Sequence, residues 1–220
     1  AAAFEQAAAD GSVRSKYLPI DQNSLEGLLF PDTYQVSNGE SEAQVATRMV
    51  GLFERVAAQE NLDVRAKELG ITPYQAIIVA SLIEREAKVE ADRPKIARVI
   101  YNRLALKMPL QIDAALYYQQ DPTLDFAALK LIDTPYNLYL HKGLPPTPIA
   151  NPGRASLHAA LFPAANPSKG DRLCVGLPKR TPCEYLYYVL ADKDGRHVFA
   201  TTYEQHLANV EKARVAGILP

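Results

Sequence analysis

The stretch with the clearest chemical signature ends in two glutamates, Glu84 and Glu86, which follow the apolar run 76–83. Every residue of that run except Ser81 is apolar, so a helix here has no face for water and is expected to be buried. At about 100° per residue, Glu84 continues the stripe that contains Ile77 and Ser81. Desolvation at the end of a buried stripe raises the pKa of a carboxyl group, as a general acid requires. The pattern therefore predicts Glu84 as a catalytic acid, with Glu86 pointing away from it.

A simpler interpretation of the same residues is structural. A glutamate at the end of a helix is commonly a solvated surface residue, and Glu84 stands four positions before Lys88. An ion pair at that spacing would stabilise the helix without any chemistry. Both interpretations stay open at the level of the helix alone.

The helix that carries these glutamates has a well-marked start. Thr72 is a suitable N-cap, Pro73 suits the first helical position, and Gln75 completes a T-x-x-Q capping box. A second box at Ser41–Gln44 opens a helix that runs to about residue 59. The apolar periodicity and end signals predict further helices over 63–69, 94–106, 156–162 and 202–217, and helical pieces over 114–133.

Strands are fewer. Tyr185–Ala191 and His197–Thr201, joined across an Asp194-Gly195 pair, predict a β-hairpin, and 25–36 predicts short strands or a packed turn. The expected fold class is therefore α+β: a mostly helical domain with a buried central helix, short strands and a C-terminal β-hairpin.

Composition narrows the function classes. The chain has 220 residues, 48% of them hydrophobic, which suits one medium domain, or one domain with a small appendage. A net charge of −1 without a basic block argues against nucleic acid and anionic membrane surfaces as partners. The four histidines show no ligand spacing, so neither a metal nor a cofactor is predicted. No apolar run is long enough to span a bilayer, and because the chain begins with Ala1 we expect a membrane segment to precede it.

The two cysteines, Cys174 and Cys183, lie nine positions apart in a loop rich in Gly, Pro, Lys and Arg. This is not a C-x-x-C metal or redox spacing. A local disulfide in an oxidising compartment and two separate thiols are both compatible with it.

Glycines and prolines exclude regular structure from about 142 to 153, and the surrounding loop carries Tyr136, Asn137, Tyr139 and Asn151. Tyr rings stack on sugars and Asn amides bond hydroxyl and N-acetyl groups, so this loop is predicted to line a carbohydrate cleft. The segment 109–114 is expected to be extended and to present Asp113.

Five stretches taken in order resemble one protein family. They are LEGLLFPDTY, ASLIEREA, NRL with LQID, YNLY with GLPPTPIANPG, and YLYYVLADKDGRHVF. Together they resemble the catalytic domain of the YceG-like family, the endolytic murein transglycosylases, from about Leu25 to about His206. The resemblance implies a catalytic domain over 21–217, and a linker or a remnant of an upstream LysM-like region over 1–20.

The resemblance also implies a bacterial, membrane-anchored protein whose catalytic domain lies on the extracytoplasmic side of the cytoplasmic membrane. Its substrate would be the glycan strands of peptidoglycan, cut internally between N-acetylmuramic acid and N-acetylglucosamine to leave 1,6-anhydro ends. Peptidoglycan synthases are expected as partners.

Site residues follow from the family's motifs. The family's catalytic Glu lies in a segment like A-S-I-[IV]-E-K-E, which maps onto Glu84, in agreement with the helix geometry. The N-R-L and L-Q-x-D patterns imply substrate-binding roles for Asn102, Gln111 and Asp113. Arg103 is expected to pair with Glu86 or Asp113.

A lytic transglycosylase needs only one carboxyl group, which donates a proton to the glycosidic oxygen and then accepts one from the C6 hydroxyl. Two alternatives stay open. A hydrolytic muramidase would use Glu84 with Asp113 or Asp32 as the second carboxylate. A non-catalytic glycan-binding scaffold would use Glu84 only as a structural ion pair.

Overall fold

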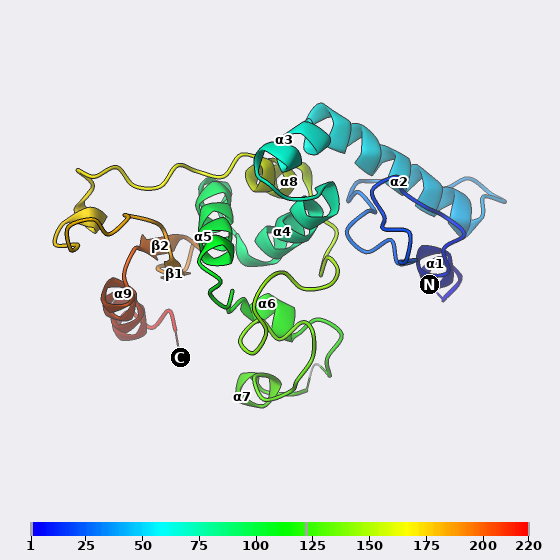
Figure 1. The fold of residues 1–220 in the computed structure, drawn as a ribbon. Coiled ribbons are helices and arrows are strands. Elements are labelled where there is room, and N and C mark those ends of the chain that lie inside the picture. The colour runs from blue at the N-terminus through cyan, green and yellow to red at the C-terminus, as the bar shows by residue number, and fades with distance from the viewer. Residues whose placement is uncertain (1, 122, 220) are drawn as a thin grey trace.

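The computed structural model describes residues 2–121 and 123–219. It confirms an α+β fold in which helices predominate and one antiparallel hairpin lies near the C-terminus (Figure 1). Residue 1 of the expected segment 1–20 and residue 122 of the expected segment 114–133 lie outside the described residues. The elements in order are α1 (Ala2–Ala9), α2 (Glu42–Gln59), α3 (Leu62–Glu68), α4 (Pro73–Glu86), η1 (Glu90–Asp92), α5 (Arg93–Ala105), α6 (Asp113–Leu116), α7 (Phe126–Leu129), α8 (Arg154–Leu161), η2 (Arg172–Cys174), β1 (Tyr187–Leu190), β2 (His197–Ala200) and α9 (Tyr203–Val215).

Helix α4 is the centre of the molecule, with α1 and α2 on one side and the hairpin and α9 on the other (Figure 1). Its predicted capping box is confirmed: Gln75 N–H donates to Thr72 Oγ1 at 3.1 Å, and Thr72 N–H donates to Gln75 Oε1 at 2.9 Å. Every residue from Ala76 to Ile83 is buried, as the apolar run predicts. The helix packs most closely against α8 and also contacts α3, α5 and α6.

Ser81, the one polar residue in the buried run, is fully buried and bonded on both sides. Its hydroxyl donates to Ile78 O at 2.7 Å and accepts from Ile149 N–H at 3.1 Å. Because a buried hydroxyl without partners would destabilise the core, these bonds account for a serine at this position. They also attach the long loop that precedes α8 to the central helix.

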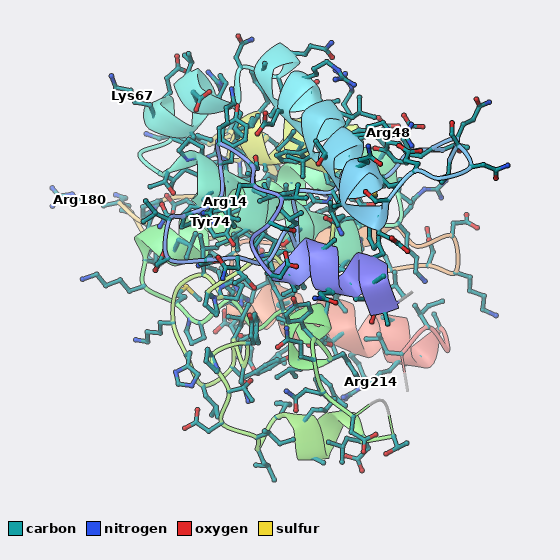
Figure 2. The ribbon with its side chains drawn as sticks, turned by 90° about the vertical axis from the view of Figure 1, so that its right-hand side faces the viewer. Arg14, Arg48, Lys67, Tyr74, Arg180 and Arg214 are labelled. Atoms are coloured by element: carbon teal, nitrogen blue, oxygen red, sulfur yellow. A yellow bond between two sulfur atoms is a disulfide. The ribbon has the colours of Figure 1, made fainter. Side chains whose placement is uncertain are left out.

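The N-terminal segment covers the start of α4. Tyr74 OH donates to Gln22 Oε1 at 2.8 Å, and Arg14 donates to the backbone oxygens of Pro19 and Gln22 at 2.9 Å each. Figure 2 shows Arg14 and Tyr74 close together on this face. Residues 25–36 form a packed turn and contain no strand, so the second of the two expectations for this segment holds. Gly27 is required there, since its φ is +83° and a Cβ would lie 2.4 Å from Pro148.

The predicted hairpin is confirmed with shorter strands than expected. Strands β1 and β2 pair antiparallel, with Tyr187 opposite Ala200 and Leu190 opposite His197. Helix α9 follows and contacts both strands. Among the described helices, none combines the length and the apolar character that a membrane crossing requires.

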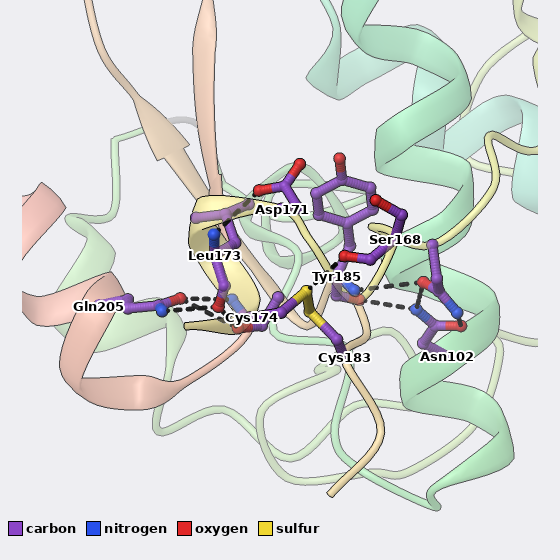
Figure 3. The surroundings of a disulfide bond; sticks show 10 residues. Asn102, Ser168, Asp171, Leu173, Cys174, Cys183, Tyr185 and Gln205 are labelled. Carbon is purple, nitrogen blue, oxygen red and sulfur yellow. Dashed lines mark hydrogen bonds between the residues drawn. A yellow bond between two sulfur atoms is a disulfide. The ribbon is translucent and has the colours of Figure 1, made fainter. Parts of the chain in front are cut away.

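The loop between α8 and β1 is held by a disulfide and by an asparagine pair (Figure 3). Cys174 and Cys183 are bonded, with Cα atoms 5.5 Å apart, which settles in favour of the disulfide a choice that the sequence leaves open. Asn102 Nδ2 donates to Asn166 Oδ1 at 2.8 Å and to Tyr185 O at 2.9 Å. These contacts fix the two ends of the loop to α5 and to the start of the hairpin.

We expect Leu82→Ala to lower the free energy of unfolding by about 2–5 kcal/mol, because it opens a cavity in the fully buried centre of α4. Urea denaturation followed by circular dichroism measures the change. The matched control is Leu131→Ala, since Leu131 is 83% exposed, and its effect should stay within about 0.5 kcal/mol. Equal effects of the two substitutions would contradict a core centred on α4.

Candidate active site

A cavity of about 660 Å³ opens where the end of α4 meets the hairpin, α9 and the segment 110–113. This volume is in the range of small-molecule and cofactor sites. Acidic, basic, amide and phenolic groups converge in its wall: Glu86, Arg103, Gln111, Asp113, Tyr139 and Tyr188. Within residues 2–121 and 123–219 no group of His, Cys, Asp or Glu is arranged to hold a metal ion.

Glu86, the last residue of α4, brings a carboxyl group into this cavity. Tyr188 OH, from β1, donates to Glu86 Oε2 at 3.0 Å. Burial raises the pKa of Glu86, and the negative charge of Asp113 raises it further, while the bond from Tyr188 opposes them. A carboxyl group with a raised pKa keeps its proton to higher pH and is suited to act as a general acid.

Asp113 supplies a second carboxylate to the same wall. Contrary to the expectation, the segment before it is not extended throughout, because Gln111 has a φ of +54°, and Asp113 itself is the first residue of the short helix α6. Tyr139 OH donates to Asp113 Oδ1 at 2.5 Å. Burial and the charge of Asp113 both raise the pKa of Tyr139, so the phenol keeps its proton and continues to donate.

Arg103 also lines the cavity. The ion pair expected between Arg103 and Glu86 or Asp113 is not formed. Its guanidinium donates instead to Leu186 O at 2.7 Å, to Leu110 O at 2.9 Å and to Gln111 Oε1 at 3.2 Å. Within the described residues it forms no salt bridge. The guanidinium of Arg103 is occupied by carbonyl groups of the segment before α6 and of the hairpin. Its role is to hold these two walls of the cavity together.

Glu84 does not line the cavity. Its Oε2 accepts from Gly153 N–H at 3.1 Å, and Gly153 is the N-cap residue of α8. A carboxylate at the amino end of a helix is stabilised by the helix dipole. In this position Glu84 joins the ends of α4 and α8, and its predicted role as the catalytic acid stays a prediction.

The other predicted site residues divide between the cavity and the surrounding framework. Gln111, Asp113 and Tyr139 line the cavity together. Asn102 lies in the framework, where it holds Asn166 and Tyr185.

Three further residues predicted for a sugar cleft have partners elsewhere. Asn137, which is 1% exposed, donates to Lys130 O and Ile132 O and accepts from Tyr139 N–H and Leu140 N–H. Asn151 accepts from Leu29 N–H at 2.9 Å, and Tyr136 OH bonds Thr147 Oγ1 at 2.8 Å. The bonds of Asn137 and Tyr136 order the loop itself, and those of Asn151 tie it to the segment that contains Leu29.

The sequence-based prediction missed several groups of the cavity wall, among them Glu86, Tyr188, His206 and Arg214. Glu86 follows a buried stripe through Val79 and Ile83 just as Glu84 follows one through Ile77, so helix periodicity did not separate them. The other three come from the hairpin and α9, far along the chain. The sequence predicts the strand or helix that contains each of these three residues. It does not predict which of those elements lies next to α4.

Comparison with known proteins shows to which family the chain belongs. A model of the YceG-like family matches residues 1–212. The chain belongs to the YceG-like family. A protein of Bacillus subtilis (strain 168) named endolytic murein transglycosylase is 36% identical over 193 residues, which are 87% of this chain and 48% of that protein. A Streptococcus pneumoniae protein of the same name is 29% identical over 94% of this chain and 36% of its own length.

A solved structure has a fold similar to that of this chain. A crystal structure of a YceG-like protein from Listeria monocytogenes matches with a TM-score of 0.69 and 31% identity, covering 94% of this chain and 62% of that one. The chain spans about half or less of the length of the curated relatives it matches.

We expect Glu86→Gln and Glu84→Gln to change stability in opposite directions. Because burial raises the pKa of Glu86 above its unfolded value, ionisation destabilises the folded state as pH rises above the ordinary glutamate range. Glu86→Gln should therefore be more stable than the parent protein at pH 8, and this gain should disappear toward pH 4. Urea titrations at the two pH values measure it.

Glu84→Gln keeps an acceptor for Gly153 N–H but removes the charge at the amino end of α8. It should lower stability at pH 8 by about 0.3–1 kcal/mol. A stabilising Glu84→Gln, or a Glu86→Gln without a pH-dependent gain, would show that the two carboxyl groups have been assigned the wrong surroundings.

Proposed function

We propose that this member of the YceG-like family is the catalytic part of a lytic transglycosylase that cuts murein glycan strands internally. The observation that carries the proposal is the geometry of one cavity, where the Glu86 carboxyl accepts from Tyr188 OH at 3.0 Å and shares the wall with Asp113. The names of the Bacillus and Streptococcus relatives support the substrate and the reaction. The proposal includes a location outside the cytoplasmic membrane, where murein lies, and the disulfide is compatible with an oxidising compartment.

In the proposed mechanism Glu86 acts twice. Its protonated carboxyl group donates to the glycosidic oxygen between N-acetylmuramic acid and N-acetylglucosamine as that bond breaks. The resulting carboxylate then accepts the proton of the C6 hydroxyl, whose oxygen bonds to C1 of the same muramic acid. The product is a 1,6-anhydro end, no water is consumed, and Glu86 returns to its protonated form.

Asp113 has a supporting role in this mechanism. Bond cleavage leaves positive charge near C1, and a fixed carboxylate in the same cavity stabilises it. The bond from Tyr139 OH holds Asp113 in place and leaves its second oxygen free of that partner. Helix geometry and the family motif point to Glu84 as the acid, whereas the cavity favours Glu86, and experiment can compare the two directly.

A hydrolytic muramidase is the second candidate function, and a specific observation keeps it in view. Glu86 and Asp113 line one cavity, and paired carboxylates are the usual arrangement in glycoside hydrolysis. In that reaction Asp113 would act as nucleophile or activate a water molecule, and the products would carry reducing ends. The two functions therefore differ by one water molecule in the product.

Digestion of uncrosslinked murein strands, read by mass spectrometry, tests these assignments. We expect products one water lighter than hydrolytic ones from the parent protein and from Glu84→Gln, and a loss of at least about 100-fold in rate for Glu86→Gln, since general acid catalysis contributes about that factor or more. Full-mass reducing ends would establish the muramidase. Activity lost in Glu84→Gln and retained in Glu86→Gln would return the catalytic role to Glu84.

The pH dependence of the rate gives a second test. The bond from Tyr188 lowers the pKa of Glu86, so Tyr188→Phe should raise that pKa further. Because the general acid must be protonated, the fall in rate on the alkaline side should move to higher pH in the variant. Tyr187→Phe is the matched control, since within the described residues Tyr187 neither lines the cavity nor forms a hydrogen bond with Glu86, and its profile should be unchanged. An identical shift in both variants would contradict a role for Glu86.

A further inference from the structure

The loop over 167–184, which contains the disulfide, is attached to the rest of the chain at a single carbonyl group. Among the residues that the structure describes, two hydrogen bonds join this loop to other segments, and both end at Leu173 O. Thr201 Oγ1 and Gln205 Nε2 donate them, each at 2.9 Å. Figure 3 shows Leu173 and Gln205 side by side next to the disulfide. No salt bridge between described residues involves the loop.

The disulfide between Cys174 and Cys183 restricts where Leu173 O can lie. Cys174 follows Leu173 directly, and Asp171 caps the same short helix, η2, by accepting from Leu173 N–H at 2.9 Å. A ring closed between residues nine positions apart has fewer open conformations than a free loop. Without the bond, the entropy that the loop loses on closing onto α9 would be larger. Both cysteines are half-buried, so a small reductant can reach the disulfide.

Helix α9 depends on this attachment because little of its own surface is buried. It packs on β1 and β2, and Ala213 is its one buried residue. Elements with few buried apolar contacts open locally at a low cost in free energy. The helix is also a wall of two cavities. His206 lines the cavity that contains Glu86, and Lys212 lines a second one, of about 880 Å³, between α9, β2 and the loop. Loosening α9 would therefore open both cavities.

We propose that the disulfide is a redox-sensitive latch for α9. In the oxidised protein it keeps Leu173 O on Thr201 and Gln205, so α9 stays on the hairpin. A dithiol such as dithiothreitol exchanges with the disulfide: the S–S bond breaks, two cysteine thiols form, and the reductant leaves as its own cyclic disulfide. The reduced loop then releases Leu173 O, and α9 leaves the hairpin more often. The inference does not rest on the proposed function, because it concerns the protein without a ligand.

Amide hydrogen exchange on the unliganded protein, read by mass spectrometry, tests the latch. We expect reduction by dithiothreitol to speed exchange in α9 by at least about tenfold, since the chain-entropy model gives about 100-fold for a ring of this size. The amides of α2, at the opposite end of the molecule (Figure 1), are the internal control and should keep their rates. Faster exchange confined to 167–184, or equally faster exchange in α2 and α9, would overturn the proposal.

Two double variants separate the latch from other effects of the reductant. Cys174→Ser with Cys183→Ser should behave like the reduced protein, and dithiothreitol should not change it further, because the chain has no other cysteine. A further effect of dithiothreitol on α9 in this variant would contradict the latch.

Thr201→Val with Gln205→Glu tests the route from the disulfide to α9. The pair removes both donors to Leu173 O and keeps an acceptor for Thr201 N–H, which now donates to Gln205 Oε1 at 3.0 Å. If the bonds to Leu173 O transmit the effect, reduction should no longer change exchange in α9 of this variant. A full effect of reduction on α9 in the variant would show that the latch does not act through Leu173 and would overturn the proposal.

Discussion

The burial of α4 on all sides is the constraint on which the rest of the structure depends. A helix without a polar face must be enclosed by other elements, and here α8, α3, α5 and α6 enclose it. Such a helix brings any polar group at its end directly to the boundary of the core. Glu84 and Glu86 stand at that boundary, and because they are separated by about 200° around the axis, they meet different surroundings. Glu84 contacts the amino end of α8, and Glu86 lines the cavity.

The walls of the cavity come from segments far apart in the chain, and backbone bonding to Arg103 holds them in register. Its guanidinium reaches carbonyl groups on both sides of the cavity, at Leu110 and at Leu186. A buried guanidinium that donates several bonds to fixed carbonyl groups is well satisfied without a carboxylate partner. This leaves Glu86 and Asp113 without a neutralising ion pair from Arg103, so burial and their mutual repulsion set the pKa of Glu86.

The sequence contained most of the fold because its signals are local. The capping boxes at Ser41 and Thr72, the apolar run of α4 and the hairpin over 187–200 each depend on a few neighbouring residues, and all are present in the structure. The site was less accessible because it depends on long-range neighbours. Asn137 illustrates the difficulty: a Tyr/Asn-rich loop suggested sugar binding, yet its amide bonds the backbone of its own turn. The contacts of Tyr188 with Glu86 and of Gly153 with Glu84, both between segments far apart in the chain, distinguish the two glutamates.

The same burial that stabilises α4 also makes Glu86 chemically useful. A carboxyl group at the surface would ionise at ordinary pH and gain nothing from its protein surroundings. At the end of a buried helix its charged form is disfavoured, so the folded state is less stable than it would be with a neutral residue there. A sequence selected for stability alone would place an amide or an apolar residue at position 86. Glu86 lines the cavity and accepts from Tyr188 OH, whereas Glu84 accepts from Gly153 N–H at the start of α8, so the two carboxyl groups have different surroundings.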